Sequence, residues 1–161
     1  MKKHKICIVG GGLTGLISAL VLSEKGLDID LIVEKTTSKI KDLRVTAISE
    51  QNMKFLKSTI KNINLKLFYP VKKINLFFEK NNQVKNFLNF DENKNLMFFF
   101  ENRSIKEHLS KLLKKTKIKV QKKTIKSINL MENKVSTSLS SRSYDLIILC
   151  LGSNSPIYQK I

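Results

Sequence analysis

The three glycines of the segment Gly10-x-Gly12-x-x-Gly15 constrain the fold of this chain more than any other feature of its sequence. They stand between an apolar run, Lys5–Val9, and residues 14–25, where apolar side chains recur at helical spacing. The first glycine permits a tight turn, the second lets a bound group approach the backbone, and the third lets the helix pack closely on the strand. These residues therefore predict a strand, a glycine turn and a helix in immediate succession.

A second apolar run, Ile29–Val33, completes a strand-helix-strand unit and ends at Glu34, about 20 residues after the glycine turn. The helix N-terminus would favour a pyrophosphate, because its amide groups and its dipole attract anions. Glu34 can accept hydrogen bonds from both hydroxyls of an adenosine ribose, and its charge would repel a 2′-phosphate. The motif therefore predicts a dinucleotide site that disfavours NADP. It leaves FAD and NAD open, and a glycine turn without a ligand is the alternative.

The rest of the chain mixes helices with strands around a β-rich middle. Ser49 is expected to cap a helix that runs to about Ser58, and a further helix is expected over Ser104–Lys115. The expected strands are Lys73–Glu79, Val84–Phe90, Leu96–Phe100, Ile118–Val120, Thr124–Leu130, Val135–Leu139 and Asp145–Leu151. We expect one α/β domain over residues 1–161, with a Rossmann-like βαβ unit, a parallel sheet and a β-rich insertion at about residues 62–100.

The net charge of +17 raises the question of nucleic-acid binding, but the kind of base argues against it. Of 30 basic residues, only Arg44, Arg103 and Arg142 are arginines, the usual readers of bases and phosphates. Dispersed lysines fit attraction to an anionic membrane surface better. Glycines interrupt the apolar N-terminal stretch, so it is not a signal peptide, and no run is long enough for a transmembrane helix. We expect a cytoplasmic protein with peripheral contact at the inner face of the membrane.

The two cysteines and two histidines form no pattern typical of catalysis or metal binding. Cys7 and Cys150 lie in apolar strand-like runs and belong to no Cys-x-x-Cys pair, so we expect two reduced core residues and no metal site. His4 and His108 are far apart in sequence and are assigned no role.

Four segments follow one another in an order found in a known family: Ile6–Glu34, Arg44–Ser49, Phe100–Ile105 and Asp145–Pro156. Together they resemble the ubiquinone-biosynthesis hydroxylase family of FAD-dependent monooxygenases, which are relatives of para-hydroxybenzoate hydroxylase. The resemblance runs the length of the chain, whereas members of that family are much longer. It implies an incomplete, N-terminal part of a para-hydroxybenzoate-hydroxylase-like fold, and an open reading frame that continues after Ile161.

The resemblance implies a set of residues around FAD. The residues expected to cradle the pyrophosphate are Gly10, Gly12, Leu13 and Gly15, and Glu34 is expected at the adenosine ribose. Ile125 would touch the adenine through its backbone, Arg44 would lie beside the phosphates and ribityl chain, and Arg103 would contact the flavin side. Thr14 and Lys35 are expected among the cofactor-binding residues. Ordinary surface charges remain the alternative for both arginines. Leu151 stands where the family usually has an aspartate linked to FAD and pyridine-nucleotide contacts, which puts NAD(P)H as the reductant in doubt.

The activity implied by the resemblance is hydroxylation of a polyprenylated phenol, a ubiquinone precursor, alongside other ubiquinone-biosynthesis proteins. No catalytic side chain is expected, because the flavin supplies the oxygen chemistry. The chain by itself is expected to be inactive and to hold FAD weakly. Two alternatives stay open: a different FAD- or NAD-dependent oxidoreductase, and a non-catalytic nucleotide-binding remnant. Flavin absorbance with retained FAD would separate a flavoprotein from an NAD-dependent enzyme.

Overall fold

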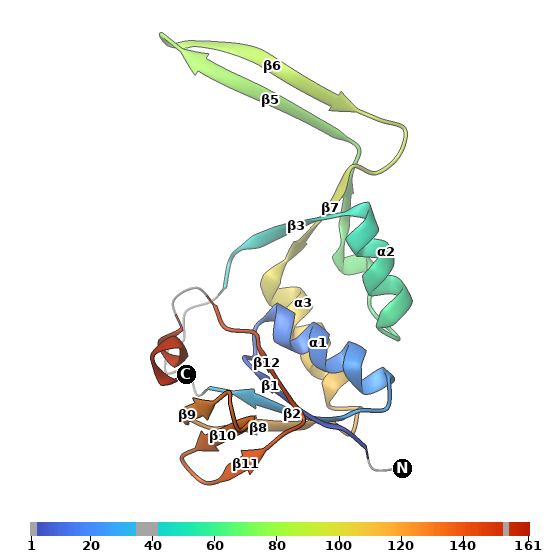
Figure 1. Ribbon diagram of the computed structural model, residues 1–161. Coiled ribbons are helices and arrows are strands. Elements are labelled where there is room, and N and C mark those ends of the chain that lie inside the picture. Colours follow the sequence, from blue (N-terminus) through green and yellow to red (C-terminus); the bar gives the residue numbers. More distant parts are fainter. Residues whose placement is uncertain (1–2, 35–41, 153–154) are drawn as a thin grey trace. The chain divides into compact units, whose positions relative to one another are not determined.

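The computed structural model describes residues 3–34, 42–152 and 155–161, and the chain divides into two units (Figure 1). The first unit combines Met1–Lys41 with Lys106–Ile161, and the second comprises Asp42–Ile105. Lys35, expected among the cofactor-binding residues, lies outside the described residues.

The first unit is built on a parallel sheet whose strand order is β12-β1-β2-β8. Its strands are β1 (Lys5–Val9), β2 (Asp28–Val33), β8 (Lys119–Lys122) and β12 (Leu146–Leu149). Helix α1 (Leu13–Glu24) connects β1 to β2 and packs on both strands. Gly26 follows with φ +78°, the left-handed conformation in which helices commonly end. The predicted α/β fold with its βαβ unit is confirmed.

The two faces of this parallel sheet are covered differently. An antiparallel sheet of β9 (Ile125–Asn129), β10 (Lys134–Thr137) and β11 (Ser141–Ser143) packs on the face that carries Cys7 and Val9. The buried cluster there consists of Cys7, Val9, Ile32, Ile125, Ile128, Val135, Tyr144 and Ile157, the last from the 3-10 helix η2 (Pro156–Lys160). Because side chains alternate along a strand, the buried Ile6 and Ile8 lie on the other face, with α1.

The second unit has its own small core. Strands β3 (Val45–Ser49), β7 (Met97–Glu101) and β4 (Tyr69–Val71) form an antiparallel sheet in the order β3-β7-β4. Helix α2 (Glu50–Thr59) packs on β3 and β7, and the 3-10 helix η1 (Leu65–Leu67) precedes β4. The hydroxyl oxygen of Ser49 accepts a hydrogen bond from the amide of Asn52 at 3.2 Å, as predicted for a cap. The rings of Phe68 and Phe100 meet edge to face, 5.4 Å apart.

A two-stranded ribbon extends from this unit, formed by β5 (Lys73–Lys80) and β6 (Gln83–Asp91) (Figure 1). Its turn residues, Asn81 and Asn82, have φ +51° and +57°, as a tight hairpin turn of the I′ type requires. Asparagine tolerates this conformation better than most residues. Helix α3 (Asn102–Leu113) follows β7 and leads from the second unit back into the first.

Several strand boundaries differ from the sequence expectation. Strand β8 covers Lys119–Lys122 rather than Ile118–Val120, because its pairing runs from Asp30↔Lys119 to Val33↔Lys122 and does not follow apolar content. Strand β10 ends at Thr137 rather than at Leu139, since Thr137 and Ser140 close a turn through hydrogen bonds in both directions.

Strands β3, β4 and β11 were not expected from the sequence. Two of them, β4 and β11, have only three residues each. Such short strands form because a neighbouring strand is already in place, and they leave little periodic signal in the sequence.

Candidate functional site

The glycine turn after β1 is held by backbone contacts from two directions. Gly10 has φ +119°, a conformation that residues with a side chain rarely adopt. A β-carbon on Gly10 would collide with the backbone carbonyl oxygen of Cys150. The amide of Gly10 donates to the carbonyl oxygen of Ile32 at 2.9 Å. The turn is therefore fixed between the ends of β2 and β12.

Two more glycines allow α1 to start directly against this turn. A β-carbon on Gly15 would collide with the carbonyl oxygen of Gly10. A β-carbon on Gly11 would lie 2.6 Å from Cγ1 of Val33. This role of Gly11 was not predicted, although the run of three consecutive glycines was the signal that could have revealed it.

Gly12 differs from its neighbours because nothing in the described protein lies near its missing side chain. A β-carbon there would have no heavy atom within 4 Å, and φ −75° with ψ 179° is open to any residue. Gly12 is the N-cap of α1, and no side chain caps the helix. The turn therefore leaves space directly before the first turn of α1.

The amide groups at this helix start are suited to an anion. The first helical hydrogen bond runs from the amide of Leu16 to the carbonyl oxygen of Gly12, so the amides of Leu13, Thr14 and Gly15 take no part in the helical ladder. The first turn of α1 carries no acidic side chain. Open space at Gly12 and amides ahead of the ladder fit the pyrophosphate of a dinucleotide.

Glu34 lies at the same edge of the sheet as the glycine turn. It follows the last residue of β2 directly and is half-buried. The amide of Lys123 donates to the carbonyl oxygen of Val33 at 3.1 Å, which ties this end of β2 to the chain leaving β8. The structure thus brings the turn and Glu34 together at the carboxyl ends of parallel strands, where α/β sheets bind ligands.

The side chain of Ile125 serves the core rather than the surface. It is 1% exposed and belongs to the buried cluster between the two sheets of the first unit. Because the side chain is buried, only the backbone of Ile125 is left for the expected contact with adenine. The contact itself stays a prediction.

A cavity of about 520 Å³ adjoins the glycine turn within the first unit. Gly11 and Val33 form one side of it, and α3 and β8 form the other. Lys106, Lys114 and Lys122 line it. These three charges make the surroundings of the turn electropositive, which favours an anionic ligand.

Arg44 and Arg103 both belong to the second unit, where the structure places them at one junction. The carbonyl oxygen of Arg44 accepts a hydrogen bond from the amide of Asn102 at 3.0 Å, and Arg103 is the next residue of α3. The hydroxyl of Thr46 donates to the side-chain oxygen of Asn102 at 2.6 Å. The two arginines are therefore set by the same contact between β3 and the start of α3.

The Arg44 guanidinium is exposed and paired with Asp42. Its Nε and Nη2 atoms donate to the Asp42 carboxylate at 2.8 and 2.7 Å. This hydrogen bonding raises the pKa of Arg44 above its ordinary value. A phosphate that recruits Arg44 would have to compete with Asp42.

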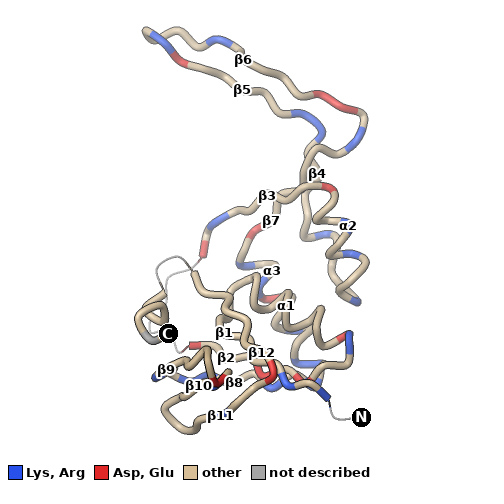
Figure 2. Tube along the Cα trace, viewed as in Figure 1, with Lys and Arg blue, Asp and Glu red and all other residues tan. Residues whose placement is uncertain are grey.

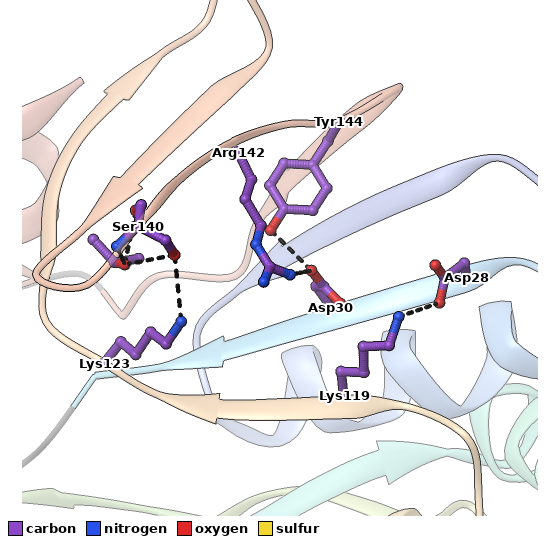
Figure 3. Close-up of polar contacts among 8 residues, drawn as sticks. Asp28, Asp30, Lys119, Lys123, Ser140, Arg142 and Tyr144 are labelled. Carbon is purple, nitrogen blue, oxygen red and sulfur yellow. Dashed lines mark hydrogen bonds and ion pairs between the residues drawn. The ribbon is translucent and has the colours of Figure 1, made fainter.

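Sequence reasoning missed a buried polar cluster under β2. Asp30 is fully buried, and Figure 3 shows Tyr144 and Arg142 converging on it. The Tyr144 hydroxyl donates to Oδ2 of Asp30 at 3.0 Å, and Nη1 of Arg142 lies 3.5 Å from the same oxygen. Oδ1 of Asp30 has no hydrogen-bond partner among the described residues. An aspartate inside the apolar run Ile29–Val33 was the signal that could have indicated this cluster.

The cluster joins the antiparallel sheet of the first unit to β2, the strand that Glu34 follows. Cys7 pairs with Asp30 in the register of β1 and β2. Burial, with a smaller contribution from the Asp30 charge, raises the pKa of the Cys7 thiol to about 12. Burial also raises the pKa of Tyr144. Both groups therefore stay protonated at neutral pH.

Leu151 stands at the position where the ubiquinone-biosynthesis hydroxylase family usually has an aspartate. Its side chain packs against the buried cluster of the first unit. It follows β12 and Cys150, whose carbonyl oxygen meets Gly10. The residue thus contributes apolar contact at the end of the sheet and no charge.

Two other kinds of site are absent from the described part of the chain. Residues 3–34, 42–152 and 155–161 contain no group of three or more acidic, histidine or cysteine side chains that could hold a metal ion. None of the described helices is long and apolar enough to cross a membrane.

Comparison with known proteins adds a family to this geometry. The model of the FAD binding domain family matches residues 3–143. No curated protein sequence matches the chain at a significant level.

Solved structures share its fold at low sequence identity. A 2-methyl-3-hydroxypyridine-5-carboxylic acid oxygenase superposes with a TM-score of 0.76 at 15% identity, over 99% of this chain and 42% of that one. The protein FqzB gives 0.74 at 15% identity, over 95% and 37%. The tetracycline destructase Tet(51) gives 0.66 at 16% identity, over 99% and 42%. The chain thus spans about two fifths of the length of these structures.

Proposed function

The chain belongs to the FAD binding domain family, and on that premise we propose that it is the cofactor-binding part of a hydroxylase acting on a polyprenylated phenol in ubiquinone biosynthesis. FAD is its cofactor, and the domain is of the flavin monooxygenase type. The observation that carries the proposal is the open space at Gly12 in front of the α1 amides.

The residues present divide the binding of FAD between them. The turn from Gly10 to Gly15 would hold the pyrophosphate on the amides of Leu13, Thr14 and Gly15. Glu34 would accept hydrogen bonds from the adenosine ribose, and Arg44 and Arg103 would serve the phosphate and flavin side. Bound flavin supplies the oxygen chemistry of ring hydroxylation, and the protein contributes position and exclusion of water.

The proposed substrate rests on the resemblance of four sequence segments and on charge. A polyprenyl tail resides in a membrane, so the enzyme must meet its substrate there. Figure 2 shows Lys and Arg distributed over most elements of the chain, which has a net charge of +17. Such a surface is attracted to anionic lipids, so peripheral contact and nearby ubiquinone-biosynthesis proteins form part of the proposal. NAD(P)H is proposed as the reductant.

Leu151 favours a second candidate, a nucleotide-binding protein without hydroxylase activity. An apolar side chain packed on the core cannot make the polar contacts expected of an aspartate at that position. Under this reading FAD or ADP binds, but no phenol is oxidised.

The test has two parts. Calorimetry with residues 1–161 and their Gly12→Val variant should show ADP binding that the variant loses, with FAD held weakly. The protein isolated from its source cells should contain FAD and add one oxygen atom to a phenol with a polyprenyl tail, and less readily to the same phenol without the tail. Bound FAD without product would favour the second candidate, and absence of ADP binding would refute both.

A further inference from the structure

The cavity beside the glycine turn lies between one side of α3 and one face of β8. Its residues from α3 recur at helical spacing, so they share one side of the helix. They are Lys106, Ser110, Leu113 and Lys114. Its residues from β8 and the segment just before it alternate, so they share one face of the strand. They are Ile118, Val120 and Lys122. The cavity is therefore a defined space between two elements of the first unit.

The cavity has the size and length of a small-molecule site. Its volume is about 520 Å³, and ligand pockets in proteins commonly measure about 300–1,000 Å³. Between Lys106 and Lys114 the helix rises roughly 12 Å. Between Ile118 and Lys122 the strand rises roughly 13 Å. The lining thus extends for a similar length along both elements, which suits an elongated ligand.

The apolar part of the lining is aliphatic throughout. Leu16 and Leu113 are 5% and 4% exposed, and Val33, Ile118 and Val120 complete the walls. Among the described residues that line the cavity, none is aromatic. The walls therefore offer no ring on which a base, a flavin or a phenol could stack. An aliphatic chain matches them, because its burial removes apolar surface from water on both sides.

The charged part of the lining is entirely positive. It consists of the exposed lysines Lys106, Lys114 and Lys122, and no acidic residue of the described chain lines the cavity. The hydroxyls of Ser110 and Thr116 donate to backbone carbonyl oxygens, each at 2.7 Å. The ammonium groups are thus the donors best placed to meet a ligand, and they favour an anion.

The cavity is distinct from the dinucleotide site, although the two meet at Gly11 and Val33. Neither Gly12 nor Glu34 lines it. Lys122 is paired with Val33 at the carboxyl ends of their strands, whereas Ile118 lies before the start of β8, toward the opposite edge of the sheet. A ligand in the cavity would therefore extend along β8, away from the edge where the pyrophosphate is expected.

We propose that this cavity is a second binding site, which takes an aliphatic chain that ends in an anionic group, as in a fatty acid. The chain lies on the aliphatic walls, and its acidic group meets the lysines. A free fatty acid and an acidic phospholipid share this chemistry, and the experiment separates the two sources. The inference does not rest on the proposed function, because neither hydroxylation nor FAD enters the argument.

Calorimetry of the 161-residue chain with decanoate, kept below its micellar concentration, tests the site. We expect one decanoate per chain. Affinity should rise about tenfold for every two methylene groups from hexanoate to decanoate, because each added group is buried. Decyltrimethylammonium has the same chain with a positive head group, so it should bind about tenfold more weakly or worse.

Two pairs of lysines on α3 provide a matched comparison. The double variant Lys106→Gln, Lys114→Gln removes two charges from the lining and should weaken decanoate binding about tenfold. The double variant Lys111→Gln, Lys115→Gln removes two charges from residues of the same region that do not line the cavity. Its affinity should stay within about twofold, since exposed charges at a distance are screened by salt.

Val120→Trp provides a second variant, which acts on the apolar walls instead of the charges. Val120 is 47% exposed, so a larger side chain can be accommodated there while it occupies the cavity. Decanoate binding should be lost. Circular dichroism and ADP affinity of every variant should match those of the parent chain.

Sedimentation with phosphatidylglycerol vesicles identifies the natural source of the ligand. If the Lys106, Lys114 double variant loses vesicle binding and the Lys111, Lys115 double variant keeps it, the site takes a membrane lipid. If both double variants bind vesicles equally while only the first loses decanoate, the site takes a free acid.

Four results would overturn the inference: no decanoate binding, equal binding of the cationic amphiphile, equal loss of decanoate in both lysine double variants, or displacement of decanoate by saturating ADP. The last result would assign the cavity to the dinucleotide site. ADP binding measured without decanoate reports on the proposed function, so its failure is distinguishable from failure of the second site.

Discussion

The carbonyl oxygen of Gly10 occupies the space that a side chain at Gly15 would need. This contact sets α1 directly on the turn that follows β1, and it separates two kinds of glycine in the motif. Gly15 is required by the fold, whereas the open space at Gly12 is available to a ligand. Gly15→Ala should therefore destabilise the protein by about 3 kcal/mol or more, because a backbone atom blocks the new methyl group. Urea unfolding measures this effect.

Gly12→Ala is the matched change at the other position. Its backbone angles suit alanine and its surroundings are empty, so stability should stay the same or rise by about 0.4–1 kcal/mol. Affinity for ADP should fall, since the methyl group enters the space expected to hold the pyrophosphate. A variant that unfolds, or one that binds ADP as tightly as the parent protein, would contradict the division of roles.

Glu34→Gln should weaken adenosine-nucleotide binding without unfolding the protein. The amide keeps the shape of the carboxylate but loses charge-assisted hydrogen bonds to the ribose, for a cost of about 1–2 kcal/mol. Calorimetry with ADP checks this. Glu50→Gln, which removes a half-buried carboxylate paired with Lys54, should leave ADP affinity unchanged and serves as the control.

Arg103→Gln should distinguish the flavin side of the cofactor from the adenosine side. If Arg103 serves the flavin, FAD affinity should fall by about 1–2 kcal/mol while ADP affinity stays the same. Quenching of flavin fluorescence and calorimetry with ADP measure the two. Lys111→Gln, also on α3, removes a positive charge of the same helix and should affect neither. An equal loss for FAD and ADP would assign Arg103 to the phosphates instead.

Cys7 should make the protein less stable in alkali. The pKa of its thiol is about 12 in the folded protein, against an ordinary value of 9.0. The stabilisation is complete below pH 9 and is lost as the pH rises toward the folded value, because the unfolded chain releases the proton first. Cys7 alone should lower the free energy of unfolding by about 2 kcal/mol between pH 8 and 10.5. Urea unfolding across this range measures it.

The Cys7→Ala variant is the control for this slope. It will be less stable at every pH because it leaves a small cavity, but its dependence on pH should be shallower. The pKa of Tyr144 is also raised, so the Cys7→Ala variant should still lose some stability above pH 10. A variant with the slope of the parent protein would show that Cys7 is not the group responsible.

The βαβ unit could be predicted from the sequence because its determinants are local. The glycine spacing, the helical repeat of α1 and the apolar strands β1 and β2 all lie within the first 34 residues. The strands Lys73–Glu79 and Val84–Phe90 were predicted for the same reason, although their pairing through the turn at Asn81 and Asn82 was not. Patterns of this kind depend on neighbours along the chain.

The parts that could not be predicted depend on residues far apart in sequence. Asp30 and its hydrogen-bond partner Tyr144 are separated by 114 positions, and nothing local in the sequence pairs them. The short strands β4 and β11 are set by β7 and β10, against which they pair. The positions of Arg44 and Arg103 at one junction follow from the pairing of β3 with β7, which likewise joins distant segments.

The first unit also constrains the order of events during synthesis. The amide of Lys5 donates to Asp145, 140 positions later, and β12 pairs with β1 along its length. While the ribosome is making the intervening residues, β1 has an open edge, and Gly10 lacks the contact with Cys150 that fixes its turn. Closing so long a loop is slow, because its entropy must be lost before the contacts form. Nascent chains should therefore be caught by chaperones at this stage and become able to bind nucleotide only after β12 has emerged.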